Sequence, residues 1–190
     1  MTRRAGFEDL QFRRADRGDA DAIAALHADS WRRHYRGAYS DAFLDGDVLT
    51  ERLAVWTDRL QARDQQRYTV LATNDGGLAG FANTEFDDDP TWGALLDNLH
   101  VAQGFKRRGL GSQLLALTAR AVVDRGTPLY LWVLEQNTDA QSFYEAHGAR
   151  RVERAPTSPP GGVASRLAGP SAKLRYAWSD PTALLGSREE

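Results

Sequence analysis

Apolar residues along the chain follow two kinds of spacing, and these spacings predict most of its secondary structure. Apolar positions three or four residues apart predict helices after Asp19, over 48–60 and from Leu110 onwards. Short apolar runs predict about seven strands, at 11–14, 68–73, 78–86, 95–101, 128–134, 150–154 and 172–178. The Asn-Asp-Gly-Gly turn at 74–77 predicts that the second and third strands form a hairpin.

The order of these elements indicates one α/β (α+β) domain. Asn137 as N-cap and Gly148 after the last turn bound a further helix of about ten residues. Strands and helices then follow in an order that suits a mixed, mostly antiparallel sheet with helices on both faces. We expect a single domain over 1–178 and a flexible tail over 179–190, with a turn-rich connection at 41–49.

A glycine loop with three basic residues lies between the fourth strand and the helix after it, reading Lys-Arg-Arg-Gly-Leu-Gly-Ser over 106–112. Backbone N–H groups at a helix start can face an anion, and glycines let a ligand approach the backbone, so the loop predicts a pyrophosphate cradle. Gln113 and Leu114 exclude the spacings of a P-loop and of a dinucleotide-binding loop. The alternative is an ordinary turn with a solvated basic tip.

Two segments resemble the GCN5-related N-acetyltransferase (GNAT) family. Lys106, Gly109 and Gly111 follow the family's Arg/Gln-x-x-Gly-x-Gly/Ala signature, with Lys at the first position. The second segment is similar to the family's Asn-x-x-Ala-x-x-Phe-Tyr-x-x-x-Gly-Phe and matches it at Asn137, Ala140, Phe143, Tyr144 and Gly148, with Ala149 replacing the last aromatic residue. The resemblance covers most of the chain, from about residue 10 to 178.

The resemblance implies the GNAT-like fold and an acyl-CoA-dependent N-acyltransferase. In its simplest form, the acetyl group of acetyl-CoA passes to a primary amine by direct attack in a ternary complex. The acceptor would be a small-molecule amine or an amine of a peptide or protein. The alternative is a non-catalytic acyl-CoA-binding or regulatory module of the same fold, and Tyr144 favours the enzyme because a pure binder needs no proton donor there.

The resemblance also implies the residues that bind acetyl-CoA and protonate the leaving thiolate. The pyrophosphate would meet Lys106, Arg107, Arg108, Gly109, Leu110, Gly111 and Ser112. The pantetheine arm would meet Asn137 and the backbone of Leu99, His100 and Val101, where the family's strand bulges. Tyr144 would be the general acid. The alternatives are an N-cap for Asn137 and a core tyrosine for Tyr144.

The general base and the acceptor pocket are less sharply defined by the sequence. Asp97, expected on one strand face with Leu99 and Val101, and Glu85 are the candidate bases, and a water chain is the alternative. Trp31 and Tyr35 either border the acceptor pocket, as such a segment does in the family, or face the core. The Pro- and Gly-rich loop 155–170 either shapes the acceptor mouth or is a disordered surface insertion.

Composition excludes several other classes of protein. The formal net charge is −2, and the basic triplet 106–108 lacks interleaved aromatic residues, so we expect no nucleic-acid or membrane partner. With no cysteine there is no disulfide, thiolate metal site or cysteine acyl-enzyme, and neither the histidines nor Asp87–Asp89 have metal-ligand spacing. No signal-peptide pattern or apolar run of about 20 residues is found, so we expect a cytoplasmic protein. The sequence leaves a homodimer open.

Overall fold

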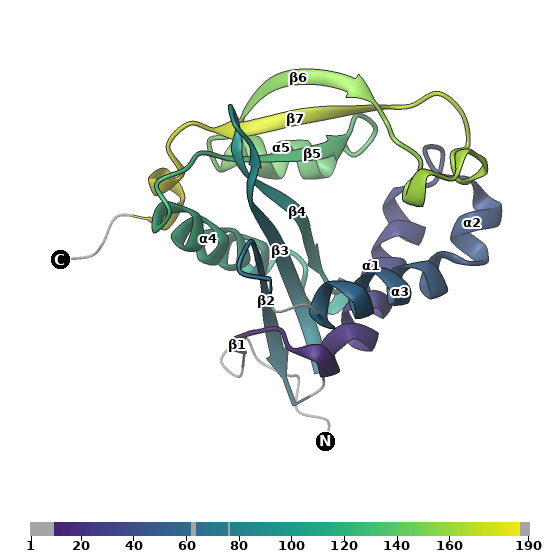
Figure 1. The fold of residues 1–190 in the computed structure, drawn as a ribbon, viewed down its shortest axis with the longest axis horizontal. Helices are drawn as coiled ribbons and strands as arrows, with labels where there is room; N and C mark the ends of the chain where they lie inside the picture. The colour runs from purple at the N-terminus through teal and green to yellow at the C-terminus, as the bar shows by residue number, and fades with distance from the viewer. Residues whose placement is uncertain (1–9, 62–63, 76, 187–190) are drawn as a thin grey trace.

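The computed structural model describes residues 10–61, 64–75 and 77–186 and has a central sheet of seven strands, with helices on both faces (Figure 1). The strand order is β1-β2-β3-β4-β5-β7-β6, and only β4 and β5 run parallel to each other. This confirms the predicted mixed, mostly antiparallel sheet. The strands are β1 Gln11–Arg14, β2 Arg67–Asn74, β3 Gly77–Asp89, β4 Gly93–Val101, β5 Leu129–Leu134, β6 Arg150–Pro156 and β7 Ala172–Trp178. The helices are α1 Ala20–His34, α2 Asp41–Asp45, α3 Val48–Gln61, α4 Leu110–Val123 and α5 Thr138–Ala146.

Side chains that point alternately to the two faces of the sheet form two apolar layers. On one side Leu71 of β2 and Phe81 of β3 are fully buried against α1 and against Trp56 of α3. On the other side Val70 and Ala72 pack in the cluster that contains α4. Because successive side chains of a strand point to opposite faces, the central strands are buried on both sides.

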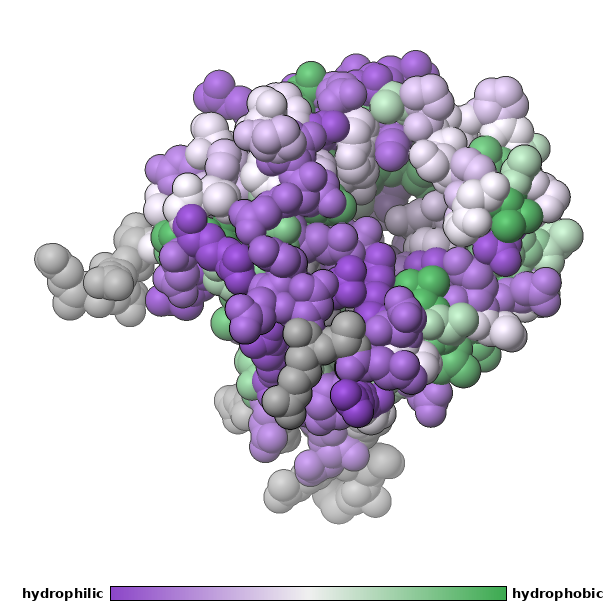
Figure 2. Space-filling view, viewed as in Figure 1, coloured by the Kyte–Doolittle hydropathy of each residue, from purple (hydrophilic) through white to green (hydrophobic). Residues whose placement is uncertain are grey.

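β4 and β5 pair with each other at only two positions and then diverge. The paired residues are Ala94 with Leu129 and Leu95 with Tyr130. Beyond them each strand presents an edge to the space between the strands. Figure 2 shows the molecule hollowed on this side, between the β5–β7 end of the sheet and the helices α1 to α3. The divergence therefore places an opening at the carboxyl end of the parallel pair.

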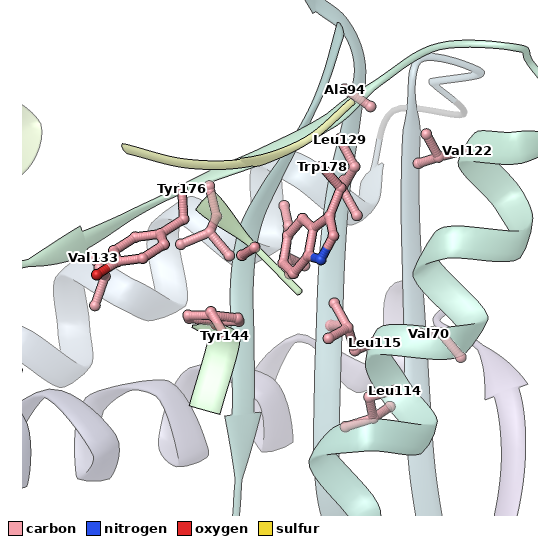
Figure 3. Packing of buried hydrophobic residues seen from close by; sticks show 14 of the residues in the cluster. Val70, Ala94, Leu114, Leu115, Val122, Leu129, Val133, Tyr144, Tyr176 and Trp178 are labelled. Atoms are coloured by element: carbon pink, nitrogen blue, oxygen red, sulfur yellow. The ribbon is translucent and has the colours of Figure 1, made fainter. Parts of the chain in front are cut away.

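α4 holds the diverging strands from the opposite face. Leu110, Leu114, Leu115 and Val122 at helical spacing are almost completely buried in one cluster with β4 and β5. Figure 3 shows Leu114, Leu115 and Val122 facing the strands, with Tyr144 of α5 in the same cluster. Each such buried side chain contributes about 1.5 to 3 kcal/mol to folding.

A β-bulge in β4 overturns one expectation about Asp97. Asn98 pairs with Asn83 and Leu96 with Thr84, so Asp97 is the extra residue between them. The bulge breaks the period of two, and the Asp97 carboxylate reaches Arg59 of α3 while Leu99 packs toward α4. The prediction that Asp97 shares a face with Leu99 and Val101 was wrong, and the bulge expected within 99–101 lies at Asp97.

The β6–β7 connection is built into the fold, so the alternative of a disordered insertion was wrong. The backbone N–H of Ser40 donates to the carbonyl of Arg166 at 2.8 Å, and that of Ala168 to Ala38 at 2.9 Å. The Arg166 guanidinium also lies 3.6 Å from the Glu51 carboxylate. The connection is thereby held against the start of α2.

Two further segments differ from the expectation. The connection at 41–49 contains the short helix α2, whose Phe43 and Leu44 are buried. Within the expected tail, Pro181–Leu185 forms a 3-10 helix, and Leu184 packs against the α4 cluster. Residues 187–190, and Gly76 of the predicted hairpin turn, lie outside the described part of the chain.

Replacing Gly93 with Ala should destabilise the protein strongly. Gly93 has φ +77°, and an added Cβ would lie 2.4 Å from the carbonyl oxygen of Pro128, which cannot move without disturbing the start of β5. Backbone strain plus this collision should lower the free energy of unfolding by roughly 2 kcal/mol or more. Gly104→Ala is the control, because nothing lies within 4 Å of its added Cβ. Equal urea midpoints for the two variants would contradict this account of Gly93.

Candidate active site

The loop before α4 presents a row of free backbone donors. None of the backbone N–H groups of residues 107–112 donates to a carbonyl within the described ranges. Arg107 at φ +59° and Gly109 at φ +82° adopt left-handed conformations in this loop. Unpaired N–H groups at a helix start attract anions, so the geometry fits the predicted pyrophosphate cradle.

The cradle's side chains have different environments. Arg107 and Arg108 are exposed and have no carboxylate within ion-pair distance in the described part of the chain. The Leu110 side chain is buried in the core, so this residue can offer a ligand only its backbone N–H. At Gly111 an added Cβ would lie 3.3 Å from the Phe143 ring, so this glycine permits the close packing of α4 on α5.

Hydrogen bonds through His147 link the two predicted motifs. Its Nδ1 lies 2.7 Å from the carbonyl of Phe143, and its Nε2 lies 2.8 Å from the Ser112 hydroxyl. The ring therefore donates within α5 and accepts from the first turn of α4. The Ser112 hydroxyl is thus used to join the two helices, and contact of Ser112 with a pyrophosphate stays a prediction.

Lys106 points into the same groove and is held by a histidine. Its Nζ donates to the Nε2 of His34, at the end of α1, over 2.8 Å. Partial burial and the neighbouring Arg33 lower the pKa of Lys106, and burial together with Lys106 lowers the pKa of His34. The neutral imidazole thus orients the ammonium without cancelling its charge.

A groove of about 690 Å³ runs from the cradle along the open edge of β4. The predicted residues Leu99, His100, Val101, Asn137 and Tyr144 all line it. Asn137 also caps α5, since its side-chain oxygen accepts from the N–H of Ala140 at 3.2 Å. The N-cap interpretation of Asn137 is thereby confirmed, and its contact with a pantetheine arm stays a prediction.

Tyr144 belongs to the core and to the groove at once. Its ring is 8% exposed and packs edge-on against Phe143 and Trp178. Its hydroxyl nevertheless makes no hydrogen bond to any residue that the structure describes. Burial raises the pKa of the Tyr144 hydroxyl well above its usual range, so the hydroxyl stays protonated in a groove where it has no acceptor.

A second cavity of about 370 Å³ adjoins the groove on the side of α1 and α3. The two share Tyr35, Leu96, Asp97, Asn98, Trp132 and Val133 as lining residues. Trp31 is both core and wall, because it is buried in an aromatic cluster and still lines the smaller cavity. Tyr35 stacks on Trp31, and burial raises the pKa of its hydroxyl to about 12.

The two candidate bases occupy different positions. Asp97 lines both cavities, and its Oδ2 accepts from Arg59 at 2.6 Å and also from the amides of Asn83 and Asn98. Its Oδ1 has no hydrogen-bond partner in the described ranges. Glu85 is paired with Arg59 and Arg67 at 3.5 Å each and lines neither cavity. The geometry therefore favours Asp97 over Glu85.

Three histidines lie on the α1 side of the site, and they carry little charge. His100 Nδ1 lies 2.8 Å from the Ser30 hydroxyl, and burial lowers the pKa of His100 to about 3. His27 accepts from the indole N–H of Trp56 at 3.0 Å, and burial lowers its pKa as well. Over the described residues no group of three His, Cys, Asp or Glu side chains could hold a metal ion.

The same residues contain no helix long and apolar enough to cross a membrane.

Sequence reasoning did not find Arg59, Trp132 and Lys173 as site residues. Arg59 lies in a helix whose pattern predicted only an apolar face, and Trp132 lies in an apolar strand. Lys173 starts the last strand, far along the chain from either motif. No local pattern marks them, because tertiary contacts alone bring them to the cavities.

Comparisons with known proteins find related sequences and a similar fold. The mycothiol acetyltransferase of Actinosynnema mirum is 37% identical over 83 residues, which cover 44% of this chain but only 28% of that protein. The uncharacterized N-acetyltransferase YuaI of Bacillus subtilis is 27% identical over 143 residues, covering 74% of this chain and 80% of the relative. The PaiA N-acetyltransferase of Thermoplasma acidophilum, solved in complex with coenzyme A, has a similar fold, with a TM-score of 0.69 over 89% of this chain and 99% of that one at 18% identity.

A sequence profile described as the Acetyltransferase (GNAT) family matches residues 23–149, well over half of the chain. The matched range contains the cradle, the groove, Asp97 and Tyr144. The resemblance stated from the sequence is thereby confirmed. The chain belongs to the GNAT family of N-acetyltransferases, for which acetyl-CoA is the co-substrate.

Proposed function

We propose that the protein transfers the acetyl group of acetyl-CoA to a primary amine, by direct attack of the amine within a ternary complex. The observation that carries the proposal is the junction of two cavities at the open edge of β4. The larger has a row of free N–H groups at one end, and the smaller has an unengaged carboxylate oxygen at the junction. An anionic carrier and an amine can therefore be held side by side.

The cradle residues would bind the carrier through its phosphates. The free N–H groups of 107–112 supply oriented donors, and Lys106, Arg107 and Arg108 supply positive charge. Asn137 and the backbone of Leu99, His100 and Val101 line the path from the cradle to the junction. Acetyl-CoA supplies the activated acetyl group as a thioester.

Asp97 is the proposed general base. Three donors hold its Oδ2, which leaves Oδ1 at the junction to accept the proton that the amine loses as its bond to the acetyl carbon forms. Tyr144 is the proposed general acid, because its protonated hydroxyl has no competing acceptor. It would protonate the sulfur as the bond between carbon and sulfur breaks. A hydroxyl placed in this way supports an enzyme over a module that only binds acyl-CoA.

The activity itself is tested by amine-dependent release of thiol at saturating acetyl-CoA, over a panel of amines. The chain has no cysteine to carry the acetyl group, so initial rates should follow a sequential pattern. Parallel double-reciprocal lines, or an acetylated protein formed without amine, would contradict direct attack. If no amine in the panel causes release of thiol, the result would favour the module that only binds acyl-CoA. The cytoplasmic location and the homodimer stay predictions.

Arg107→Ala should weaken CoA binding about tenfold, the usual effect of removing one charged hydrogen bond. Arg107 lines the groove and has no competing carboxylate in the described part of the chain. Arg120→Ala is the matched control, since Arg120 is an exposed arginine of α4, the helix that follows the cradle, and lines neither cavity. Calorimetric titration with CoA measures both, and equal affinities would place the phosphates elsewhere.

Tyr144→Phe should lower kcat by about 10² to 10⁴, as loss of a general acid does, with little change in KM for acetyl-CoA. The melting temperature should hardly move, because the hydroxyl has no partner to lose. Tyr176→Phe is the control, since its hydroxyl donates to Glu145 at 2.6 Å and lines neither cavity. That variant should lose about 1 kcal/mol of stability and keep its kcat. Unchanged turnover in Tyr144→Phe would remove this residue from the mechanism.

Asp97→Asn should lower kcat/KM by about 10² or more, because the amide keeps the shape of the carboxylate but cannot take the proton. Glu85→Gln removes the other carboxylate beside Arg59 and should leave the rate close to wild type. The two rates are compared on one amine. Losses of equal size would show that the Arg59 network, and not the Asp97 oxygen, sets the rate.

A further inference from the structure

The smaller cavity would hold the amine acceptor, and the charged side chains around it largely neutralise one another. Arg52 makes a two-point ion pair with Glu51 at 2.5 and 2.6 Å, and both side chains are about 10% exposed. Arg59 is shared between Asp97 and Glu85. Asp97 and Glu85 therefore present little net charge to a substrate in this cavity.

Lys173 is the exception. It lines the cavity from β7, is half-buried, and has no carboxylate within ion-pair distance among the described residues. Its Nζ lies 4.5 Å from the centre of the Trp132 ring, which holds the ammonium over the cavity wall. A half-buried cation without an anion close by attracts one more strongly than an exposed cation, because water screens it less.

Asp88 is the one carboxylate of the cavity lining that has no cationic group within ion-pair distance among the described residues. Its surroundings differ from those of Lys173. It is exposed, and one of its oxygens already accepts from the Tyr130 hydroxyl. Solvent therefore screens its charge more than that of Lys173. The charges that line the cavity therefore favour a substrate with an anionic group.

Five aromatic residues form a large part of the remaining wall, beside aliphatic residues such as Leu95 and Leu134. Trp31, Tyr35, Tyr39, Tyr130 and Trp132 line the cavity from α1, from the segment after it and from β5. Flat rings bury a large apolar area and suit an apolar or aromatic body. A volume of about 370 Å³ limits this body to a small molecule or a single side chain.

From these features we infer the class of acceptor: a small amine that also carries an anionic group and a flat apolar body, with its anion against Lys173. The inference rests on the proposed acetyl transfer. Its amine would lie at the Asp97 end of the cavity, where the two cavities join, and its apolar body against Trp132 and the tyrosines. Polyamines and other multiply cationic amines would be poor acceptors.

The test compares amines that differ only in the anion. Phenylalanine and 4-(aminomethyl)benzoate place the carboxylate at two distances from the amine, and each is compared with its neutral primary amide. Spermidine represents cationic amines. In at least one pair the carboxylate should raise kcat/KM about tenfold over the amide, and spermidine should be slower than that carboxylate. Amides or spermidine used equally well or better would overturn the inference while leaving the acetyl transfer intact.

Variants at Lys173 test whether its charge causes the preference for the carboxylate over the amide. Lys173→Met keeps the length of the side chain and should remove the preference for the carboxylate. Lys173→Arg keeps the cation and should retain most of it. A preference that survives in Lys173→Met, with the melting temperature unchanged, would overturn the assignment.

A binding measurement separates failure of the inference from failure of the proposed function. The same amines are titrated calorimetrically into protein saturated with CoA, where no transfer can occur. Tighter binding of the carboxylate than of its amide supports the inference even if no amine is acetylated, in which case the proposed function alone fails. Equal binding within both pairs overturns the inference whatever the rates.

Discussion

The parting of β4 and β5 after two paired residues is the constraint on which the rest of the molecule depends. Neighbouring strands normally satisfy each other's backbone groups, so an early separation leaves donors and acceptors without partners along both edges. Here α4 packs against β4 from one face, and α1 lies against β4 on the other. Every proposed site residue lies on an edge of this opening or on an element beside it.

Local chemistry explains why much of the site could be predicted. Gly109 must adopt a positive φ, Asn137 must cap a helix, and both requirements are visible in a few consecutive residues. The strands, the hairpin and the two motif helices follow from the spacing of apolar residues in the same way. The glycine loop before α4 and the cap of α5 were therefore accessible from the sequence.

Long-range packing explains what could not be predicted. The bulge at Asp97 reverses the side to which the carboxylate points, and no residue near it signals the extra position. The docking of 155–170 onto Ala38 and Ser40 depends on hydrogen bonds between segments far apart in the chain. The role of Gly111 depends on the approach of Phe143, so a bulky residue there would disturb helix packing as well as a bound phosphate.

The hydrogen bonds on Asp97 have a consequence for the entropy of the reaction. Three donors converge on one oxygen, so rotation of this carboxylate about χ2 is restricted before any substrate arrives. The loss of that freedom occurs once, on folding, and is not repeated in each turnover. A substitution at Asn83 or Arg59 that frees the carboxylate would therefore make the activation entropy of proton transfer less favourable. The temperature dependence of kcat would show this change.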